Sequence, residues 1–397
     1  MYISKRQLKC FILLLPIFKP IYIDYISRYI HFYTLLQSVT ITYIIVHLLK
    51  VRKSCSIMSI LAIVMQTWIL ISTIVGNGYI SEAFELLLSI SYTFLLFDYY
   101  NKQFVLLLKL LMVHAELCVH INLLTLLIAP DGFLSRSNSA YGMTQEWFLG
   151  ADAYFIMWIL PALMIAWIYA YVFYNNKRAI IISLASIITE IIRGSGTGIV
   201  AISIFFIVML LPIIKNYLTP FRSSCIGVII FLYIIIFRKS KILVPILDLL
   251  GKDWTFTGRL TIWDSAIKSI IENPILGYGV LTNDNMVNYL GRSLNGIWIG
   301  ATHCHCHFLQ IAFQGGLVAF ILMGIIIGID VYKCSKLWPN KIAKIAGISI
   351  AIYMIMGITE VLSFSVTYMI FPLVNLACDW RINSEIYTER KTGNKAI

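Results

Sequence analysis

The sequence predicts an all-α polytopic membrane protein with about 12 transmembrane helices and one long extracytoplasmic loop between helices 9 and 10. Hydrophobic residues make up 59% of the 397 residues, and charged residues make up only 13%. Because soluble globular proteins contain about 45–50% apolar and about 25% charged residues, this apolar excess does not fit one water-exposed globule. The excess lies in apolar runs along the whole chain, each near the ~20 residues that a helix needs to cross the bilayer.

The first apolar run is irregular. It follows a basic N-terminus with Lys5, Arg6 and Lys9, as in a signal peptide, but Pro16 and Pro20 interrupt it and no small-residue cleavage site follows. We therefore expect it to be retained as a membrane helix. The predicted spans cover residues 10–28, 32–49, 56–75, 80–97, 104–128, 152–174, 178–193, 196–214, 223–237, 307–330, 342–360 and 362–378.

The positive charge predicts the orientation of the chain. A net charge of +12 could indicate nucleic-acid binding, but the lysine and arginine residues fall mainly in short loops between apolar runs. With the N-terminus inside, more than half of the 31 lysine and arginine residues lie on the cytoplasmic side, as the positive-inside rule requires. We predict a multi-pass protein of the plasma (inner) membrane with both termini cytoplasmic, surrounded by membrane lipids and without a nucleic-acid partner.

Two of the outside loops are long. They span about residues 129–151 and 238–306, and only the second is large enough for a small extramembrane subdomain within a single integral membrane domain, residues 1–397. In that loop, residues 259–273 have helical periodicity, and Thr257 could cap them. They predict an amphipathic helix that lies on the membrane surface or covers a cavity. Its expected apolar face consists of Leu260, Trp263, Ile267, Ile270 and Ile271.

Arg259 lies in the first turn of this amphipathic helix. Backbone N–H groups and the helix dipole favour an anion there, and a guanidinium can bind two phosphate oxygens at once. The alternative is a surface arginine that pairs with Asp253, Asp264 or lipid head groups. Position alone does not decide between a phosphate site and a surface ion pair.

Three of the seven histidines lie close together at the end of the long loop, as His303, His305 and His307. In an extended chain their side chains would point to one side, and those of Cys304 and Cys306 to the other. Histidine and cysteine are also zinc or copper ligands, but no second cluster completes a set of four, so we predict neither a metal nor a cofactor. A disulfide between the two cysteines would close too small a ring.

A charged turn ends the seventh predicted span. Arg193 precedes Gly194-Ser-Gly196, which allows a sharp reversal into the next span, and Glu190 lies on the same helical face as Arg193. The two charges could form a structural pair, or Arg193 could clamp an anion at the membrane surface. Glu360, at the outer end of the eleventh span, could line the same cavity.

Three motifs follow one another along the chain, namely Arg193 to Gly196; Thr257 to Arg259 with Trp263 and Asn273 to Gly279; and His305 to Gln310 with Gly315 and Gly316. They resemble those of the O-antigen polymerase (Wzy) and O-antigen ligase family of glycan-joining membrane enzymes. The resemblance covers about residues 178–330, and Cys306 stands where the family usually has asparagine. The contact made by that asparagine therefore differs here, whereas the histidine before it is kept.

The resemblance implies a substrate and a mechanism. Family members transfer a glycan from undecaprenyl pyrophosphate to an acceptor hydroxyl and require no metal. Cations are then needed where charge develops on the leaving group, a role that we assign to Arg193 and Arg259. His305 would act as the base-like group that orients the acceptor hydroxyl. The other residues expected to bind substrate are His303, His307, Trp263, Tyr278 and Glu360.

We therefore predict a polysaccharide polymerase, a metal-independent glycosyltransferase that joins lipid-linked repeat units at the outer face of the plasma membrane for capsule, O-antigen or exopolysaccharide synthesis. Flippase and chain-length regulator proteins would be its partners. One alternative changes only the acceptor and gives an O-antigen ligase that transfers the glycan to lipid A-core. The other is a lipid-linked oligosaccharide flippase or transporter, although transporters more often show two similar halves, which this sequence does not.

Overall fold

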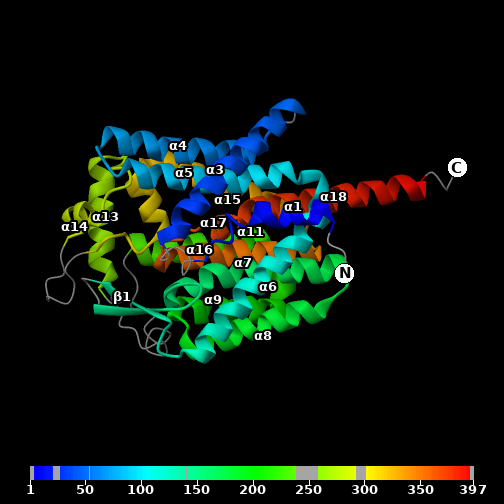
Figure 1. Ribbon diagram of the computed structural model, residues 1–397. Helices are drawn as coiled ribbons and strands as arrows, with labels where there is room; N and C mark the ends of the chain where they lie inside the picture. The colour runs from blue at the N-terminus through cyan, green and yellow to red at the C-terminus, as the bar shows by residue number, and fades with distance from the viewer. Residues whose placement is uncertain are drawn as a thin grey trace.

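The computed structural model describes residues 4–20, 27–52, 54–138, 142–237, 258–291 and 301–393, and these are almost entirely helical. Their one sheet is a hairpin of two antiparallel strands in the loop before the sixth predicted span. Figure 1 shows the helices side by side in a bundle. The elements are α1 (Lys5–Leu14), α3 (Ser27–Lys50), α4 (Ile57–Val75), α5 (Ile80–Tyr99), η1 (Asn101–Gln103), α6 (Phe104–Ile128), β1 (Leu134–Asn138), β2 (Gly142–Glu146), α7 (Asp152–Phe173), α8 (Asn176–Arg193), α9 (Gly196–Leu210), α10 (Pro212–Tyr217), α11 (Pro220–Phe231), η2 (Leu232–Ile236), α13 (Arg259–Glu272), α14 (Asn283–Leu290), α15 (His307–Lys336), α16 (Lys341–Thr359), α17 (Ser365–Tyr368) and α18 (Ile370–Gly393).

Seven helices among the described residues are long and apolar enough to cross a membrane, namely α3, α4, α5, α6, α7, α15 and α16. This confirms the predicted helical membrane fold. α9 and the continuous pair α11–η2 are apolar but shorter. The number of about 12 spans and the place of the long loop between the ninth and tenth remain predictions.

Prolines explain two differences between the predicted spans and the helices. The span expected over residues 10–28 begins as α1, which ends before Pro16, and its residues 21–26 lie outside the described ones. The span expected over residues 196–214 divides into α9 and α10 because Pro212 disfavours helical backbone in the residue before it. The two helices are correspondingly short.

The last predicted span, residues 362–378, is not one helix. Residues 361–364 form no helix, α17 is a single turn, and α18 begins at Ile370. The non-helical segment follows directly on α16 and carries Leu362, which is fully buried. It therefore brings backbone groups into the interior at this point, where they need partners.

The bundle has two ends that differ (Figure 1). α13, α14 and β1 lie at one end, whereas the N- and C-termini lie at the other. We call the first the α13 end, which also has the end of α16, and the second the termini end, which also has the start of α16. α7 and α16 form the centre, since 83% of the most apolar stretch of each is buried. The assignment of the termini end to the cytoplasm remains a prediction.

α15 is broken at Gly315 and Gly316, whose backbone is not helical. Gly316 has a φ of 62°, and a Cβ added to it would lie 2.1 Å from the carbonyl oxygen of Ile275. The loop after α13 fills the break: the Leu317 N–H donates to the Pro274 carbonyl at 2.7 Å, and two further backbone hydrogen bonds of 2.8 and 2.9 Å join the same segments. The break therefore fixes α13 to α15, the membrane helix that follows the loop with His303 and His305, which we call the histidine loop.

Candidate functional site

α13 carries Arg259 at its start, close to the position expected from the sequence. Gly258 precedes it in left-handed backbone, and Thr257, the expected cap, lies outside the described residues. Ile271 was expected on the apolar face but is 70% exposed. The buried face is the one that packs against α15, and it does not include Ile271. Its buried residues are Ile262, Trp263, Ala266, Ser269 and Ile270.

Arg259 binds the end of α16. Its guanidinium donates to the carbonyl oxygen of Thr359 and lies 3.4 Å from the carboxylate of Glu360. Thr197, near the start of α9, donates to the same carboxylate at 3.3 Å and shares a 2.9 Å hydrogen bond with the Thr359 hydroxyl. Segments that are far apart in the sequence, the starts of α9 and α13 and the end of α16, therefore meet at one ion pair.

Glu360 is nearly enclosed at this meeting point. Its side chain is 11% exposed, against 22% for Arg259. Burial raises the pKa of Glu360, while the charge and hydrogen bonds of Arg259 and the hydrogen bond from Thr197 lower it. Asp152, at the start of α7, raises the pKa of Glu360 further, so a second carboxylate lies within electrostatic range. Glu360 thus lies within electrostatic range of the Arg259 guanidinium and of a second acidic group.

Glycines shape the turn between α8 and α9. Cβ atoms added to Gly194 and Gly198 would lie 2.2 and 2.1 Å from the Glu190 carboxylate. Glu190 is buried, so the backbone of the turn closes directly over its side chain. Ser195 begins α9 by accepting a hydrogen bond from the Gly198 N–H. The turn therefore requires the absence of side chains at Gly194, in the predicted Gly-Ser-Gly reversal, and at Gly198, in the first turn of α9.

Arg193 ends α8 and is exposed. Its guanidinium donates to the side-chain oxygen of Gln145 and lies 5.5 Å from the ring centre of Trp147. In the described structure these contacts hold Arg193, rather than the ion pair with Glu190 that we had considered. Because an amide and an aromatic ring leave a cation accessible, Arg193 can still meet an anion from outside.

His303 and His305 are in contact, with ring centroids 3.9 Å apart. His305 has a φ of 48°, and left-handed backbone costs about 1–2 kcal/mol for a residue with a Cβ. Such strained residues concentrate at functional sites. Burial and the Arg259 charge lower the pKa of His303 to about 4, and burial, His303 and Arg259 hold the pKa of His305 well below its ordinary value of 6.5. Both imidazoles are neutral near pH 7, and Arg259 lies close enough to influence both.

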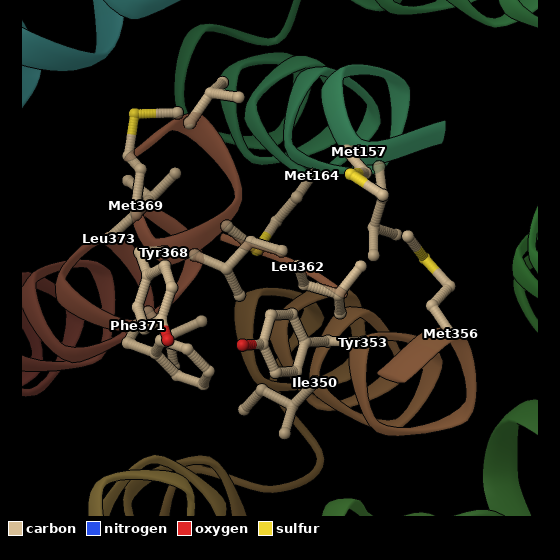
Figure 2. Packing of buried hydrophobic residues seen from close by; sticks show 14 of the residues in the cluster. Met157, Met164, Ile350, Tyr353, Met356, Leu362, Tyr368, Met369, Phe371 and Leu373 are labelled. Carbon is tan, nitrogen blue, oxygen red and sulfur yellow. The ribbon is translucent and has the colours of Figure 1, made fainter. Parts of the chain in front are cut away.

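His307, the first residue of α15, is enclosed by other residues and only 2% exposed. Its Nδ1 accepts from the Leu362 N–H at 3.2 Å, so a neutral ring carries its proton on Nε2. Nε2 then donates to the Tyr353 hydroxyl at 2.8 Å, and the Tyr368 hydroxyl lies at 3.3 Å. Figure 2 shows these two hydroxyl groups pointing toward each other from α16 and α17. The geometry favours a positioning role for His307 over the substrate contact that we expected.

The extended alternation expected for the three histidines is not observed. The segment bends, because His305 has left-handed backbone and His307 begins a helix. Cys304 and Cys306 are buried and form no disulfide among the described residues, and the Cys304 N–H donates to the side-chain oxygen of Gln310 at 2.8 Å. Among the residues that the structure describes, no three His, Cys, Asp or Glu side chains are grouped as metal ligands. Independence from metals and cofactors nevertheless remains a prediction.

Two aromatic residues that we expected to bind substrate are packed into the fold. Trp263 is fully buried in α13. Tyr278 stacks on Phe313 with 5.1 Å between ring centroids and lies 4.5 Å from the ring of Tyr289. These contacts hold α13 and the following loop against α15, and a contact with substrate remains a prediction for both.

The predicted site residues thus fall into three groups. The first group lies together at the α13 end and consists of Arg259, Glu360, His303 and His305. The second is the exposed Arg193 on the neighbouring α8–α9 turn. The third packs around the first and consists of His307, Trp263 and Tyr278.

Three residues of this region were missed by the sequence analysis, namely Thr197, Thr359 and Asp152. Thr197 directly follows the Gly-Ser-Gly turn, so its place beside an anion clamp could have been inferred. Thr359 contributes its backbone carbonyl to Arg259, a role that any residue could fill. Asp152 only begins a predicted span, and nothing in the sequence marks it as a neighbour of Glu360.

Comparison with known proteins finds a family model that matches part of the chain. Residues 143–324 match a family model described as Wzy_C, O-antigen ligase. A Rickettsia typhi protein named "Putative polysaccharide ligase" is 26% identical over 211 residues, which cover 45% of this chain. The alignment spans 50% of the length of that relative.

The fold describes a helical, multispanning membrane protein, and these matches show that part of it is similar to proteins named as glycan ligases. The matched segment runs from β2 into α15, so it includes the α8–α9 turn, α13 and the histidine loop. The matched segment is similar to the O-antigen ligase and Wzy family, in agreement with the resemblance of the three motifs. Neither match supports the transporter alternative.

Proposed function

We propose that this protein joins glycan units by transferring a glycan from a lipid pyrophosphate to an acceptor hydroxyl. The observation that carries the proposal is the meeting of Arg259, Glu360 and the neutral His303–His305 pair at one end of a membrane bundle. The family match supports it, because the matched segment contains Arg259 and both histidines. In this proposal the α13 end faces outward from the inner membrane and both termini are cytoplasmic.

Arg259 would bind the pyrophosphate leaving group. Its contacts with Glu360, 3.4 and 3.5 Å, are longer than the about 2.7–2.9 Å of a tight charge-assisted hydrogen bond. A pyrophosphate has more charge and more oxygens than Glu360 and could take over these donors, while the Thr359 carbonyl still holds the guanidinium. Charge would then develop beside a fixed cation, which stabilises the transition state. Arg193 would be the second, more accessible cation.

His305 would orient the acceptor hydroxyl and take its proton. In the transfer, the hydroxyl oxygen forms a bond to the anomeric carbon, the bond from that carbon to the pyrophosphate oxygen breaks, and the proton passes to the imidazole. A neutral imidazole can accept this proton, and the low pKa of His305 is sufficient because the leaving group is already activated. His303, in contact with the His305 ring, would fix its orientation.

The acceptor distinguishes two functions. As a polymerase, the protein would extend one undecaprenyl-pyrophosphate-linked repeat unit with another, for capsule, O-antigen or exopolysaccharide, without a metal and with flippase and chain-length regulator proteins as partners. As a ligase, it would transfer the glycan to lipid A-core. We propose the polymerase from the sequence, and the ligase is the second candidate because the family model and the Rickettsia relative are both named as ligases.

A reconstituted assay tests the proposal. The purified full-length protein is placed in liposomes that contain lipid-linked repeat units, with and without lipid A-core. Lengthened lipid-linked glycan is the result expected of a polymerase, and glycan attached only to lipid A-core is the result expected of a ligase. Movement of the repeat units between leaflets without any new glycosidic bond would reject glycan transfer.

A genetic experiment separates the same two functions in cells. Deletion of a polymerase gene leaves single repeat units, whereas deletion of a ligase gene leaves long polymer that is not attached to lipid A-core. Complementation with the Arg259→Ala variant, at normal protein levels, should reproduce the deletion. Full-length polymer in cells that carry this variant would contradict the assigned role of Arg259.

A further inference from the structure

A cavity of about 300 Å³ lies at the termini end, where α7, α9 and α16 meet. Its lining includes Trp167, Tyr171, Met209, Lys341 and Lys344, and we call it the lysine cavity. It is separate from the candidate active site, because Lys341 begins α16 and Arg259 binds the other end of that helix, about 27 Å away along its axis. The glycan-transfer proposal gives this cavity no role.

The lysine cavity is positively charged. Among the described residues that line it, two are lysines and none is a carboxylate. The Lys341 ammonium lies 5.9 Å from the ring centre of Tyr171, and the Lys344 ammonium lies 4.9 Å from the ring centre of Trp338. Lys344 also donates to the side-chain oxygen of Asn216 at 3.1 Å. These contacts orient the ammonium groups, and the two lysines give the described lining a net positive charge that attracts an anion.

Apart from Asn176, the remaining wall of the lysine cavity is apolar and aromatic. The indole N–H of Trp167 donates to the Ser183 hydroxyl at 3.2 Å, so its polar atom is satisfied and its ring supplies apolar surface. Met209 adds a flexible thioether side chain. Tyr174, also in the lining, is 93% exposed at the end of α7. Aromatic rings and lysines at helix ends are typical of the membrane–water interface.

We propose that the lysine cavity binds the phosphodiester head group of an anionic phospholipid. Basic pockets between transmembrane helices bind such head groups, and the apolar wall can hold the glycerol and the first methylenes of the acyl chains. Inorganic phosphate shares the charge but would leave this wall without a partner. With the predicted orientation, the cavity faces the cytoplasmic leaflet, whose anionic lipids supply the ligand.

The binding is measured with the full-length protein in detergent micelles. Phosphatidylglycerol with brominated acyl chains quenches tryptophan fluorescence when it binds, and phosphatidylcholine with the same chains is the neutral comparison. Replacement of Lys341 or Lys344 by glutamine should weaken phosphatidylglycerol binding about fivefold each, and the double variant about 25-fold. Lys336→Gln is the matched control, since Lys336 is an exposed lysine at the termini end outside the cavity, and it should change binding less than about twofold.

A second variant keeps the charge and changes the shape. Met209→Trp should fill the lysine cavity and weaken phosphatidylglycerol binding at least about tenfold, which tests the proposal independently of the lysine variants. Equal binding by the wild type and the lysine double variant, or by the wild type and Met209→Trp, would overturn the proposal. It would also fail if inorganic phosphate displaced the brominated lipid as effectively as unlabelled phosphatidylglycerol does, because the site would then recognise phosphate alone.

Discussion

The two ends of the helix bundle hold their cations in different ways. At the α13 end, the Thr359 carbonyl and the Glu360 carboxylate fix the Arg259 guanidinium. At the termini end, Lys341 and Lys344 lie beside aromatic rings, on flexible side chains. A fixed, planar guanidinium suits charge that develops during a reaction, whereas a mobile ammonium group suits the binding of a charge that is already present. The contrast separates a candidate site of chemistry from a candidate site of lipid binding.

The largest expected effect is at Arg259. Its replacement by alanine should lower the rate of glycan transfer about 100- to 1,000-fold, because the leaving-group charge then develops without its fixed cation. The measurement is product formation in liposomes at matched protein levels. Arg222→Ala is the matched control: Arg222 is exposed in α11 and donates to the Tyr217 carbonyl at 3.0 Å, so its loss should leave the rate unchanged. Equal rates of glycan transfer by the Arg259→Ala and Arg222→Ala variants would contradict the catalytic role that distinguishes the α13 end.

A second test addresses the histidine loop. His305→Asn should lower the rate about 100-fold, because the amide cannot accept the acceptor proton. Asparagine tolerates left-handed backbone, so the φ of 48° and the unfolding temperature should be preserved. Thermal unfolding of the purified protein checks the second expectation. An active His305→Asn variant would show that the loop binds substrate without taking part in proton transfer.

A third test addresses the break in α15. Gly316→Ala should lower the free energy of unfolding by more than about 2 kcal/mol, because the added Cβ would meet the Ile275 carbonyl and the φ of 62° disfavours any side chain. Gly324→Ala is the control in the same helix: a Cβ there meets nothing within 4 Å, so the expected change is less than about 1 kcal/mol. Equal thermal stability of the two variants would mean that α13 is not fixed by the break.

His307 should affect stability more than chemistry. His307→Leu leaves the Leu362 N–H and the Tyr353 hydroxyl without their imidazole partner in the interior, at an expected cost of about 1–3 kcal/mol. The thermal unfolding temperature in detergent should fall, while the rate per folded molecule changes less than it does for His305→Asn. A stable but inactive His307→Leu protein would instead place His307 among the reacting groups.

The smallest expected effect is that of mild acid. His303, with a pKa of about 4 in the folded protein and an ordinary value of 6.5, binds fewer protons when folded, so its contribution is complete above pH 6.5 and is lost as the pH falls toward 4. Between pH 7.5 and 6.0 the loss should be below about 1 kcal/mol. His303→Gln should make the pH dependence in unfolding measurements smaller but not abolish it, because the pKa of His305 is lowered in the same direction. An unchanged slope in that variant would assign the effect to other groups.

The membrane helices could be predicted from the sequence because each one satisfies its backbone hydrogen bonds internally and needs a long apolar run. The predicted spans for α4 and α16 differ from the helices by at most one residue at each end. The hairpin between α6 and α7 was missed, since its short polar strands do not alternate with apolar residues. Apolar runs in the sequence therefore predicted helices such as α4 and α16, but local periodicity did not predict the hairpin in the loop.

The sequence motifs predicted Arg259 and His305 as site residues, and the structure brings these two residues within electrostatic range of each other. Their catalytic roles remain predictions. The environment of His307 was not predictable, because Tyr353 and Tyr368 come from helices much later in the chain. Contacts of this kind depend on packing in three dimensions, which a single sequence does not record.

The break in α15 has a consequence for how the sequence of this protein can change. Backbone hydrogen bonds to Pro274 and its neighbours anchor α13 directly to a membrane helix, in addition to side-chain contacts such as that of Tyr278 with Phe313. The chain on either side of residues 258–291 can therefore gain or lose residues over evolutionary time without displacing Arg259. Arg259 would in this way keep its position as constantly as a residue within the membrane helices does, although it lies in the segment between them.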